Sequence, residues 1–542
     1  HFRDNPQVIG WQIDNELGNS HQDLCYCDSC RSRFQQWLKD KYGDIRGLNR
    51  AWGTVFWSQS YEAFDQIPVP LPTPNAHNPS LLLDWRRFAS DLIVEFQNLQ
   101  VEILRKECPN RFITHNFMGF FDKSDYFDLA EPLDFVSHDQ YPRLFMQGRV
   151  SLSPQDLAMP LDLIRGLKQK TFWIMEQQAG QAGWELLGPT PWPGQLRLWT
   201  YQSVAHGADT VVYFRWRTCL FGTEQYWHGI LPHNGVPGRR YAEIADTIRE
   251  LSPLMDRFVG YTSGAEVALL YSYDQRWALQ IQPHHPELDY VTQFKKYYQP
   301  LSWANIPVDI ISDRSDFSAY RLLVAPLLFL MTPELAQKLR AYVEQEGHLV
   351  LTMRTAVKDW NNAVIPEVLP AYLTDLLGME IHDYDCLRAG PVAVRWLAAS
   401  GRPGKGRSAL FGEKWADIIT TGTAEPLALY NDGYYADTAA ITVNRFAGGR
   451  AYYVGTEPDQ NLAERFVSHL VREAGIEGLL KTPAGVEAAR RSGSEKSCVF
   501  LLNHSDHAVR LLIPPGWRPL QGGEAEHRKL DLSAYDIAVY EA

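Results

Sequence analysis

The sequence contains few cysteines and no long apolar run. Seven cysteines in 542 residues are too few for a disulfide framework, which favours a reducing, cytoplasmic location. No run of about 18 apolar residues occurs, so no membrane span is expected. Basic residues are scarce too: 52 Lys and Arg against 64 Asp and Glu give a net charge of −12. This acidic balance excludes nucleic acid and an anionic membrane as expected partners.

Glycine-rich phosphate-binding loops are also missing. Gly404-Lys405-Gly406 has neither the spacing nor the preceding strand of a P-loop, and no dinucleotide fingerprint occurs. No cysteine lies on a strand-to-helix elbow, so amidotransferase chemistry is unsupported. We therefore expect no organic cofactor.

Apolar runs and longer amphipathic segments alternate between residues 8 and 252. This alternation predicts a parallel sheet covered by helices, which is an α/β fold. Five strands are too few to close an eight-stranded (β/α)8 TIM barrel. We expect the first three βα units to be missing ahead of His1, in preference to an open sheet. The predicted strands are 8–13, 111–116, 134–138, 171–175 and 210–216.

Changes of pattern along the chain predict three domains. We expect residues 1–255 to form the incomplete catalytic TIM-barrel domain, and residues 262–475 a second, Rossmann-like α/β domain. In this second domain, apolar runs predict strands at 267–272, 322–326 and 348–352, and the pattern predicts a helix over 332–346. Short alternating strands in 478–542 indicate a small C-terminal β-sandwich.

Two features of the first domain gave structural expectations. A helix before the second strand carries apolar residues at spacings of three and four, which predicts one stripe facing a sheet. Its members are Trp85, Phe88, Leu92, Phe96, Leu99 and Ile103. We expect the proline-containing segment 31–80 to be an irregular excursion, long enough to form one wall of a site.

Two glutamates follow predicted strands: Glu16 after the first and Glu176 after the fourth. The carboxyl ends of barrel strands form the open face where catalytic groups lie. A retaining glycosidase needs two carboxyls about 5 to 5.5 Å apart, one as acid and one as nucleophile. Asn15, directly before Glu16, is placed to donate to a sugar 2-hydroxyl.

Several segments carry recognisable motifs: Trp11 to Gly18, Cys25 to Cys30, Leu48 to Ser58, Asp139-Gln140-Tyr141-Pro142, Met175-Glu176-Gln177 with Trp184, Phe214 to Arg217, and Gly222 to Gly229. In these segments the sequence resembles glycoside hydrolase family 42, the β-galactosidases. It implies a retaining β-galactosidase that hydrolyses terminal β-D-galactosides through a covalent galactosyl-enzyme. It also implies that the second domain builds a homotrimer.

The resemblance implies roles for single residues as well. Glu16 resembles the family's acid/base and Glu176 its nucleophile, with Asn15 beside the acid/base. The expected substrate-binding residues are Trp57, Tyr141, Trp184, Phe214 and Glu224. Tyr141 is expected to donate to the nucleophile and lower its pKa. Where the family often has a histidine, three residues after Glu224, this chain has Trp227, and His228 follows.

Cys25, Cys27 and Cys30 lie close enough in sequence to bind one metal ion. They predict most of a structural zinc site, which requires four ligands. Zinc-binding relatives take the fourth cysteine from an earlier part of the barrel, so we expect that ligand to lie outside this chain. His21 is an alternative ligand, and a cluster of reduced thiols without metal is an alternative state.

Other functions remain open at this stage. An α-L-arabinopyranoside differs from a β-D-galactoside only by the exocyclic carbon, so a related retaining glycosidase is an alternative. A non-catalytic glycan-binding or scaffold protein is another, and it predicts sugar binding without turnover. A zinc-dependent nucleic-acid binder is disfavoured by the acidic charge.

Overall fold

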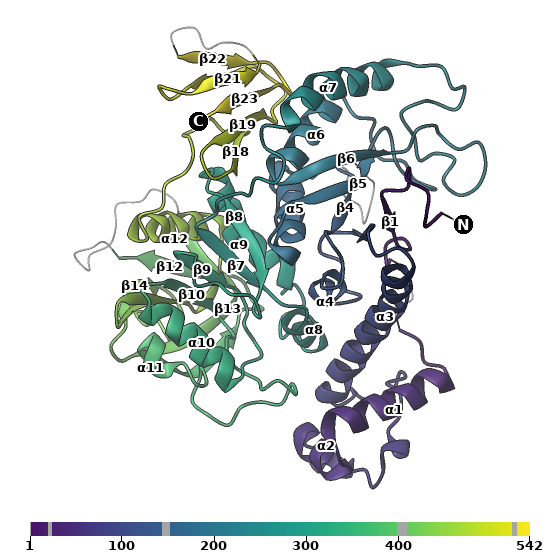
Figure 1. Cartoon of the computed structure of the whole chain (residues 1–542). Helices are drawn as coiled ribbons and strands as arrows, with labels where there is room; N and C mark the ends of the chain where they lie inside the picture. The colour runs from purple at the N-terminus through teal and green to yellow at the C-terminus, as the bar shows by residue number, and fades with distance from the viewer. Residues whose placement is uncertain (1, 20–23, 144–151, 398–408, 523–527) are drawn as a thin grey trace.

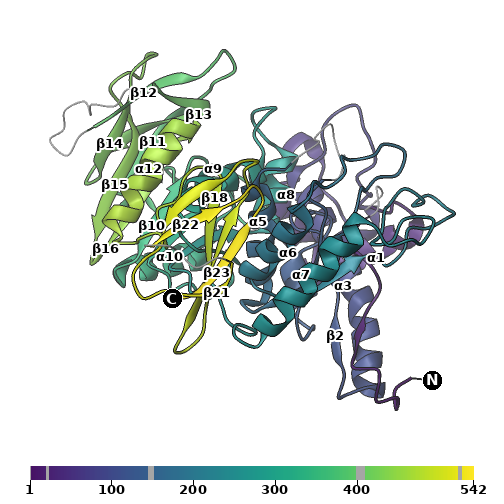
Figure 2. The ribbon, with the colours of Figure 1, turned by 90° about the horizontal axis from the view of Figure 1, so that it is seen from above.

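The computed structural model describes residues 2–19, 24–143, 152–397, 409–522 and 528–542. Three parts follow one another along the chain and lie against each other in both views (Figures 1 and 2). The first is parallel α/β, the second is built on one large mixed sheet, and the third is all β. The predicted α/β class is therefore present. Within the described residues, no helix is long and apolar enough to cross a membrane.

The first part contains the five predicted strands, and all of their pairings are parallel. The second predicted strand is interrupted at His115, which separates β2 from β3. The strands are β1 (Gly10–Gln12), β2 (Phe112–Thr114), β3 (Asn116–Phe117), β4 (Ser137–Gln140), β5 (Phe172–Gln178) and β6 (Ala208–Phe214). The helices are α1 (Asp28–Tyr42), α2 (Ile45–Trp52), α3 (Pro79–Glu107), α4 (Tyr126–Ala130), α5 (Pro154–Lys168), α6 (Gln195–Ala205) and α7 (Arg239–Met255).

The segment 31–80 is not the irregular excursion that the sequence suggested. It contains most of α1 and all of α2. Phe34 and Leu38 on α1, and Leu48 and Trp52 on α2, are spaced by one helical turn and are buried. They pack with the N-terminal half of α3 in a hydrophobic core of their own. The prediction was wrong because the prolines that suggested an irregular segment all lie after residue 67, whereas the helical spacing lies before them.

The apolar stripe of α3 does not face the sheet along its whole length. Phe96, Leu99 and Ile103 are 50%, 57% and 54% exposed. The buried side of this half of α3 carries Gln97 and Val101 instead. Gln97 donates through Nε2 to the carbonyl of Leu129, which fixes the helix by its polar side. The expectation that the stripe faces a sheet is therefore wrong: its N-terminal half, with Trp85, Phe88 and Leu92, packs with α1 and α2, and its C-terminal half is exposed.

The second part is an 11-stranded sheet. The parallel strands β16, β10, β9, β7 and β8 lie side by side, and the other strands pair antiparallel. The strands and the helix predicted around residues 267, 322, 332 and 348 are confirmed. Strands are β7 (Val267–Tyr271), β8 (Val308–Ser312), β9 (Leu322–Ala325), β10 (His348–Thr352), β11 (Met379–Cys386), β12 (Val392–Trp396), β13 (Leu410–Thr421), β14 (Glu425–Tyr430), β15 (Ala439–Phe446), β16 (Gly449–Val454) and β17 (Thr456–Pro458). Helices are α8 (Tyr273–Ile281), α9 (Tyr290–Trp303), α10 (Pro333–Glu344), α11 (Thr374–Leu377) and α12 (Gln460–Glu473).

The third part consists of two antiparallel sheets, β18-β19-β23-β21 and β20-β22. Side chains of both sheets share one hydrophobic core, as a β-sandwich requires. The outer face of the larger sheet packs on α6 and α7 of the first part. The strands are β18 (Val486–Ser492), β19 (Ser497–Asn503), β20 (Val509–Leu512), β21 (Arg518–Gln521), β22 (Lys529–Leu532) and β23 (Ile537–Glu541).

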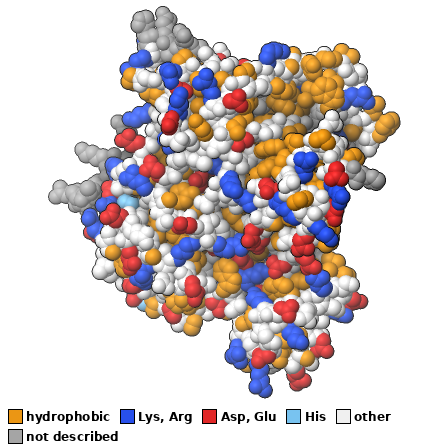
Figure 3. Space-filling view, in the orientation of Figure 1, with side chains coloured by type: hydrophobic (Ala, Val, Ile, Leu, Met, Phe, Trp, Pro, Cys, Tyr) orange, Lys and Arg blue, Asp and Glu red, His pale blue; other side chains and the backbone are white. Residues whose placement is uncertain are grey.

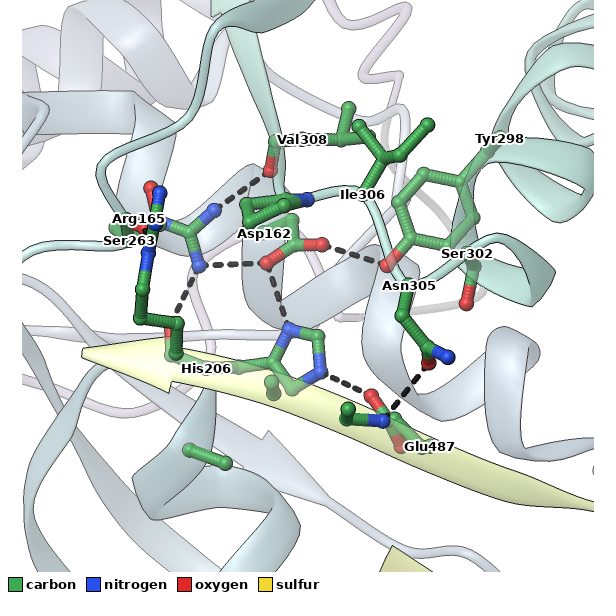
Figure 4. Close-up of a pocket in the computed structure, with 15 residues that line it drawn as sticks. Asp162, Arg165, His206, Ser263, Tyr298, Ser302, Asn305, Ile306, Val308 and Glu487 are labelled. Atoms are coloured by element: carbon green, nitrogen blue, oxygen red, sulfur yellow. Dashed lines mark hydrogen bonds and ion pairs between the residues drawn. The ribbon is translucent and has the colours of Figure 1, made fainter. Parts of the chain in front are cut away.

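The three parts meet at a buried ionic network (Figure 4). His206, at the end of α6, lies 2.7 Å from Asp162 of α5 and 2.6 Å from Glu487 of β18. Arg165 of α5 pairs with Asp162 at 2.5 Å, and Tyr298 of α9 donates to the same carboxylate. Burial lowers the pKa of His206, but the two carboxylates outweigh it and raise the pKa to about 10. A charged imidazolium thus links the first part to the third. We call this network of Asp162, Arg165, His206, Tyr298 and Glu487 the domain junction.

Candidate active site

Glu16 lies in a loop that leaves β1 with unusual backbone geometry. Asp14 and Glu16 have φ values of 51° and 44°, which are sparsely populated by residues other than glycine. His115 fixes this loop from below, because its Nδ1 contacts the carbonyl of Ile13 at 2.7 Å and its Nε2 contacts the amide of Leu17 at 3.0 Å. A carbonyl only accepts and an amide N–H only donates, so His115 is neutral with its proton on Nδ1. Burial lowers its pKa, which agrees with this state.

Asn116, the first residue of β3, connects the Glu16 loop to the sheet. Its Oδ1 accepts from the backbone amide of Glu16 at 3.2 Å and from Gln12 at 3.1 Å. Its Nδ2 donates to Asn15 Oδ1 at 2.9 Å and to Asp139 Oδ2 at 2.6 Å. The Asn15 carbonyl therefore points at Asn116, and its NH₂ group is the end that can meet a sugar hydroxyl.

Glu176 lies within β5, beside β4. The hydroxyl of Tyr141, just after β4, donates to Glu176 Oε2, as the sequence led us to expect. Burial raises the pKa of Glu176 to about 7, and the charges of Glu16 and Glu224 add to this rise. The Tyr141 hydrogen bond lowers the pKa of Glu176, as expected, but burial outweighs it. Burial and the Glu176 charge also raise the pKa of Tyr141, which stays a neutral donor.

Three carboxyl groups meet at this point. Glu16, Asp139 and Glu176 each place one oxygen within 4.8 Å of the others. Burial raises the pKa of Glu16, although hydrogen bonds from Asp139 and Asn19 partly oppose the rise. Asp139 directly follows a predicted strand and falls inside a motif of the resemblance, but the sequence alone gave it no role. His115 and Asn116 were missed too, and their signal was polar side chains at the end of an apolar strand.

Aromatic side chains form one wall of the site. The rings of Trp184 and Trp227 have centroids 4.9 Å apart, and Trp227 meets the ring of Tyr141 edge-on at 4.8 Å. Trp227 is buried, whereas Trp184 is 46% exposed. Trp227, which replaces the family's frequent histidine, therefore backs both predicted substrate-binding aromatics. Trp184 presents a ring face of the kind that sugar C–H groups stack against.

Phe214 and Glu224 are joined through Arg215. The Arg215 guanidinium lies 4.7 Å from the centre of the Phe214 ring and donates to Glu224 Oε2 at 2.9 Å. Glu224 also raises the pKa of both Glu16 and Glu176, which places its charge beside the carboxyl cluster. The structure thus brings together Asn15, Glu16, Tyr141, Glu176, Trp184, Phe214 and Glu224 of the predicted residues.

Trp57 is not brought to this cluster by any contact in the described part of the chain. It lies in a short 3-10 turn (Phe56–Ser58) after α2, stacks on Phe56 with ring centroids 4.8 Å apart, and is 65% exposed.

Other exposed apolar side chains are Leu186, Trp216, Leu220, Phe221 and Val236, in the loops that follow β5 and β6. Figure 3 shows hydrophobic side chains gathered on this side, near α7.

The three clustered cysteines lie at the start of α1. The Sγ atoms of Cys25, Cys27 and Cys30 are within 4.8 Å of one another, as a shared ion requires. Cys27 caps the helix by accepting from the backbone amide of Cys30. Three thiols at this spacing fit zinc, which favours sulfur ligands in a tetrahedral set. His21, the alternative fourth ligand, lies outside the described residues.

Strand-end carboxyls on a parallel α/β part, walled by aromatic rings, define a glycoside hydrolase. A family model described as "Beta-galactosidase" matches residues 1–254. Models described as "Beta-galactosidase trimerisation domain" and "Beta-galactosidase C-terminal domain" match 265–477 and 485–542. The chain belongs to glycoside hydrolase family 42.

Relatives and solved structures agree with this assignment. A beta-galactosidase of Clostridium cellulovorans is 37% identical over 99% of this chain and 80% of its own length. One of Halorubrum lacusprofundi is 38% identical over 94% of this chain and 74% of its own. The crystal structure of a beta-galactosidase from Bacillus circulans sp. alkalophilus matches with a TM-score of 0.93 at 33% identity, covering 100% of this chain and 80% of that one.

Proposed function

We propose that this protein is a retaining β-galactosidase. The observation that carries the proposal is the separation of its two glutamates, whose nearest oxygens lie within 4.8 Å. A retaining enzyme holds its carboxyls about 5 to 5.5 Å apart, whereas an inverting one needs about 6.5 to 9.5 Å to admit water. The names of the similar proteins supply the sugar, because those relatives are called beta-galactosidases.

In this reaction Glu176 attacks the anomeric carbon while Glu16 protonates the departing oxygen. Glu16 then removes a proton from water, which hydrolyses the galactosyl-enzyme. Tyr141 holds Glu176 Oε2 by its hydrogen bond and leaves Oε1 to attack. Asn15, fixed by Asn116, offers its NH₂ group to the 2-hydroxyl as charge develops on the ring.

The other predicted residues would hold the sugar. Trp184, backed by Trp227, would stack on its apolar face. Glu224, held by Arg215, would accept hydrogen bonds from hydroxyls. Phe214, under the same guanidinium, would close the wall between them.

The first experiment is a panel of nitrophenyl glycosides that includes the β-D-galactoside and the α-L-arabinopyranoside. We expect preferred turnover of the galactoside, and loss of turnover in Glu16→Ala and in Glu176→Ala. Azide should restore activity to Glu176→Ala and give a glycosyl azide of inverted configuration. Preferred turnover of the arabinopyranoside would reassign the substrate, and a rescued product of retained configuration would exchange the two roles.

We further propose that the five parallel strands are part of a (β/α)8 barrel closed by three more βα units. The support is apolar surface beside β1: Ile9 is 66% exposed, and Phe96, Leu99 and Ile103 of α3 are at least half exposed. In a closed barrel, neighbouring helices would cover these side chains. In a protein that carries those units, Leu99→Glu should lower the free energy of unfolding, whereas in this chain alone, where Leu99 is 57% exposed, the charge should be tolerated.

Zinc and the oligomer are separate proposals. Cys25, Cys27 and Cys30 would hold a structural zinc ion, which would tie the start of α1 to the loop before it. Residues 265–477 would assemble a homotrimer, as the description of the matching family model suggests. Metal analysis of the purified protein tests the zinc site, and a folded protein without metal would refute it. Equilibrium sedimentation tests the trimer, and a monomer at micromolar concentration would refute it.

A cytoplasmic location stays a prediction from cysteine usage, and all seven cysteines are free thiols.

A further inference from the structure

We propose that Asp139 is a positioning residue of this site, and that it acts as a neutral carboxylic acid whose O–H donates to the carboxyl group of Glu16. The inference deepens the proposed function and rests on it for the role of Glu16. Asp139 is the third carboxyl of the cluster, and the two-glutamate mechanism gives it no role.

The place of Asp139 in the sheet aims its side chain between the two glutamates. It lies near the carboxyl end of β4, between β3 and β5, and its Cα partner on β5 is Glu176. Its exposed fraction is 7%, so water does not solvate the carboxyl group. Asp139 Oδ2 accepts from Asn116 Nδ2 at 2.6 Å, which fixes the orientation of the group.

The other oxygen, Oδ1, is buried and has no hydrogen-bond donor among the described residues. One oxygen of Glu16 and one of Glu176 lie within 4.8 Å of an Asp139 oxygen, and the Asp139 and Glu16 side chains are close enough to share a hydrogen bond. Facing carboxylates repel each other in a buried site unless a proton lies between them. A proton on Asp139 turns Oδ1 into a donor and satisfies an oxygen that would otherwise be orphaned.

Asn116 transmits this arrangement to the acid/base loop. Because its Oδ1 accepts from the Glu16 amide and from Gln12, its Nδ2 must face Asp139 and Asn15. An acceptor at Asp139 therefore keeps Asn116 from rotating. Two hydrogen-bond routes, one through Asn116 and one directly to the carboxyl, then hold Glu16 in place.

The charges around Asp139 favour the neutral form. Burial raises its pKa well above the ordinary aspartate value, and the charges of Glu176 and Glu16 raise it further. Tyr141 and Tyr126 also face it, and burial raises the pKa of both, so they remain neutral. The hydrogen bond from Asn116 opposes the rise but is the weaker influence.

A neutral Asp139 serves both chemical steps. It adds no third negative charge beside Glu176, which must be ionised to attack. Its O–H stabilises the Glu16 carboxylate that forms after the aglycone takes the proton. The proton stays on Asp139 throughout, so the overall reaction still exchanges protons only between Glu16, the aglycone and water.

The test compares Asp139→Asn with Asp139→Ala. Asparagine supplies the same acceptor to Asn116 and the same donor to Glu16, without a charge. We expect Asp139→Asn to retain most of kcat and to leave both limbs of the pH profile of kcat/KM in place. Asp139→Ala should lower kcat by about 100-fold, because the Glu16 loop loses its support. Asp313→Asn removes another buried aspartate, in the second part, and should leave kinetics unchanged.

An acid limb that moves to lower pH in Asp139→Asn would overturn the proposal, because it would show that Asp139 is ionised. Unchanged kcat in a folded Asp139→Ala would overturn it as well. Infrared spectroscopy at neutral pH provides an independent readout if Asp139→Ala does not fold. The wild type should show a carbonyl band of a neutral carboxylic acid that Asp139→Asn lacks, and its absence would refute the neutral state. This readout holds even if no sugar is turned over, so it is independent of the β-galactosidase assignment.

Discussion

Two groups of buried or half-buried carboxyls in this molecule have opposite electrostatic surroundings. At the active site, Glu16, Asp139 and Glu176 face one another, and burial raises the pKa of each. At the domain junction, Asp162 and Glu487 are also buried, but both face the His206 imidazolium. There the cations outweigh burial and lower the pKa of both carboxyls.

The difference shows that carboxyl side chains can have either a structural or a catalytic role, depending on the charges around them. A buried carboxyl paired with a cation is fixed in its charged form and holds elements together. A buried carboxyl that faces another carboxyl keeps a proton within reach and can exchange it during catalysis. Arg165 and His206 make the junction a structural contact, whereas the carboxyls of the other cluster repel one another.

Glu176→Gln should separate the two clusters most clearly. We expect turnover to fall roughly 10⁴-fold or more, because the proposed nucleophile is gone. Stability should stay level or rise, since a carboxyl repelled by Glu16 is removed. Glu487→Gln should have the opposite pattern: turnover should stay level, and the free energy of unfolding should fall. Nitrophenyl galactoside kinetics and urea denaturation of both variants measure this, and a destabilised Glu176→Gln would contradict the comparison.

His206→Gln should weaken the junction by less than the about 3 to 5 kcal/mol of an unpaired buried charge, because Arg165 still pairs with Asp162 and His504 with Glu487. Urea denaturation gives this value. The matched control is His382→Gln, since His382 pairs with Glu380 at 2.9 Å but both side chains are at least half exposed. An exposed pair contributes about 0 to 1 kcal/mol, so equal effects of the two substitutions would refute the structural role of His206.

Alkaline pH should loosen the junction before it damages the core. Histidine titrates near 6.5 ordinarily, but His206 in the folded protein holds its proton to a pKa of about 10. Its stabilisation is therefore complete below pH 6.5 and is lost as the pH rises through 10, by about 1 kcal/mol per unit between them. Denaturation across this range should show the slope in the wild type, and a similar slope in His206→Gln would assign it to other groups.

Tyr141→Phe should have the smallest of these effects. The Tyr141 hydrogen bond lowers the pKa of Glu176, so its loss should raise the acid limb of kcat/KM above its wild-type position near pH 7. Losing one hydrogen bond to a charged group costs about 1.5 to 3 kcal/mol, which is roughly 10- to 100-fold in kcat/KM. The pH profile decides the point, because an unmoved limb would mean that Tyr141 only packs against Trp227.

Regular elements were predictable where the local pattern was strong. All five strands of the first part, the helix starting near Thr332 and the strand at His348 were identified from apolar runs and their flanks. The helices within 31–80 were missed, since their small core depends on contacts with α3. The exposed half of the α3 stripe was also missed, because spacing gives the apolar side of a helix but not what covers it.

The candidate site was predictable only in part. Glu16 and Glu176 were found because a strand end is a local signal with a known meaning in parallel sheets. Asp139 and Asn116 belong to the same cluster, but their hydrogen bond joins residues 23 positions apart. Single positions in a sequence do not reveal which polar side chains will face each other.

By itself, the sequence determined the α/β class, the strand ends that carry the two glutamates, and the three clustered cysteines. These follow from periodicity and spacing over a few residues, where local conformational preferences dominate. Tertiary structure alone decided the protonation of the carboxyls, because a pKa depends on burial and on charges brought near by folding. It placed Asp139 between two glutamates and His206 between two carboxylates, and so made one cluster reactive and the other structural.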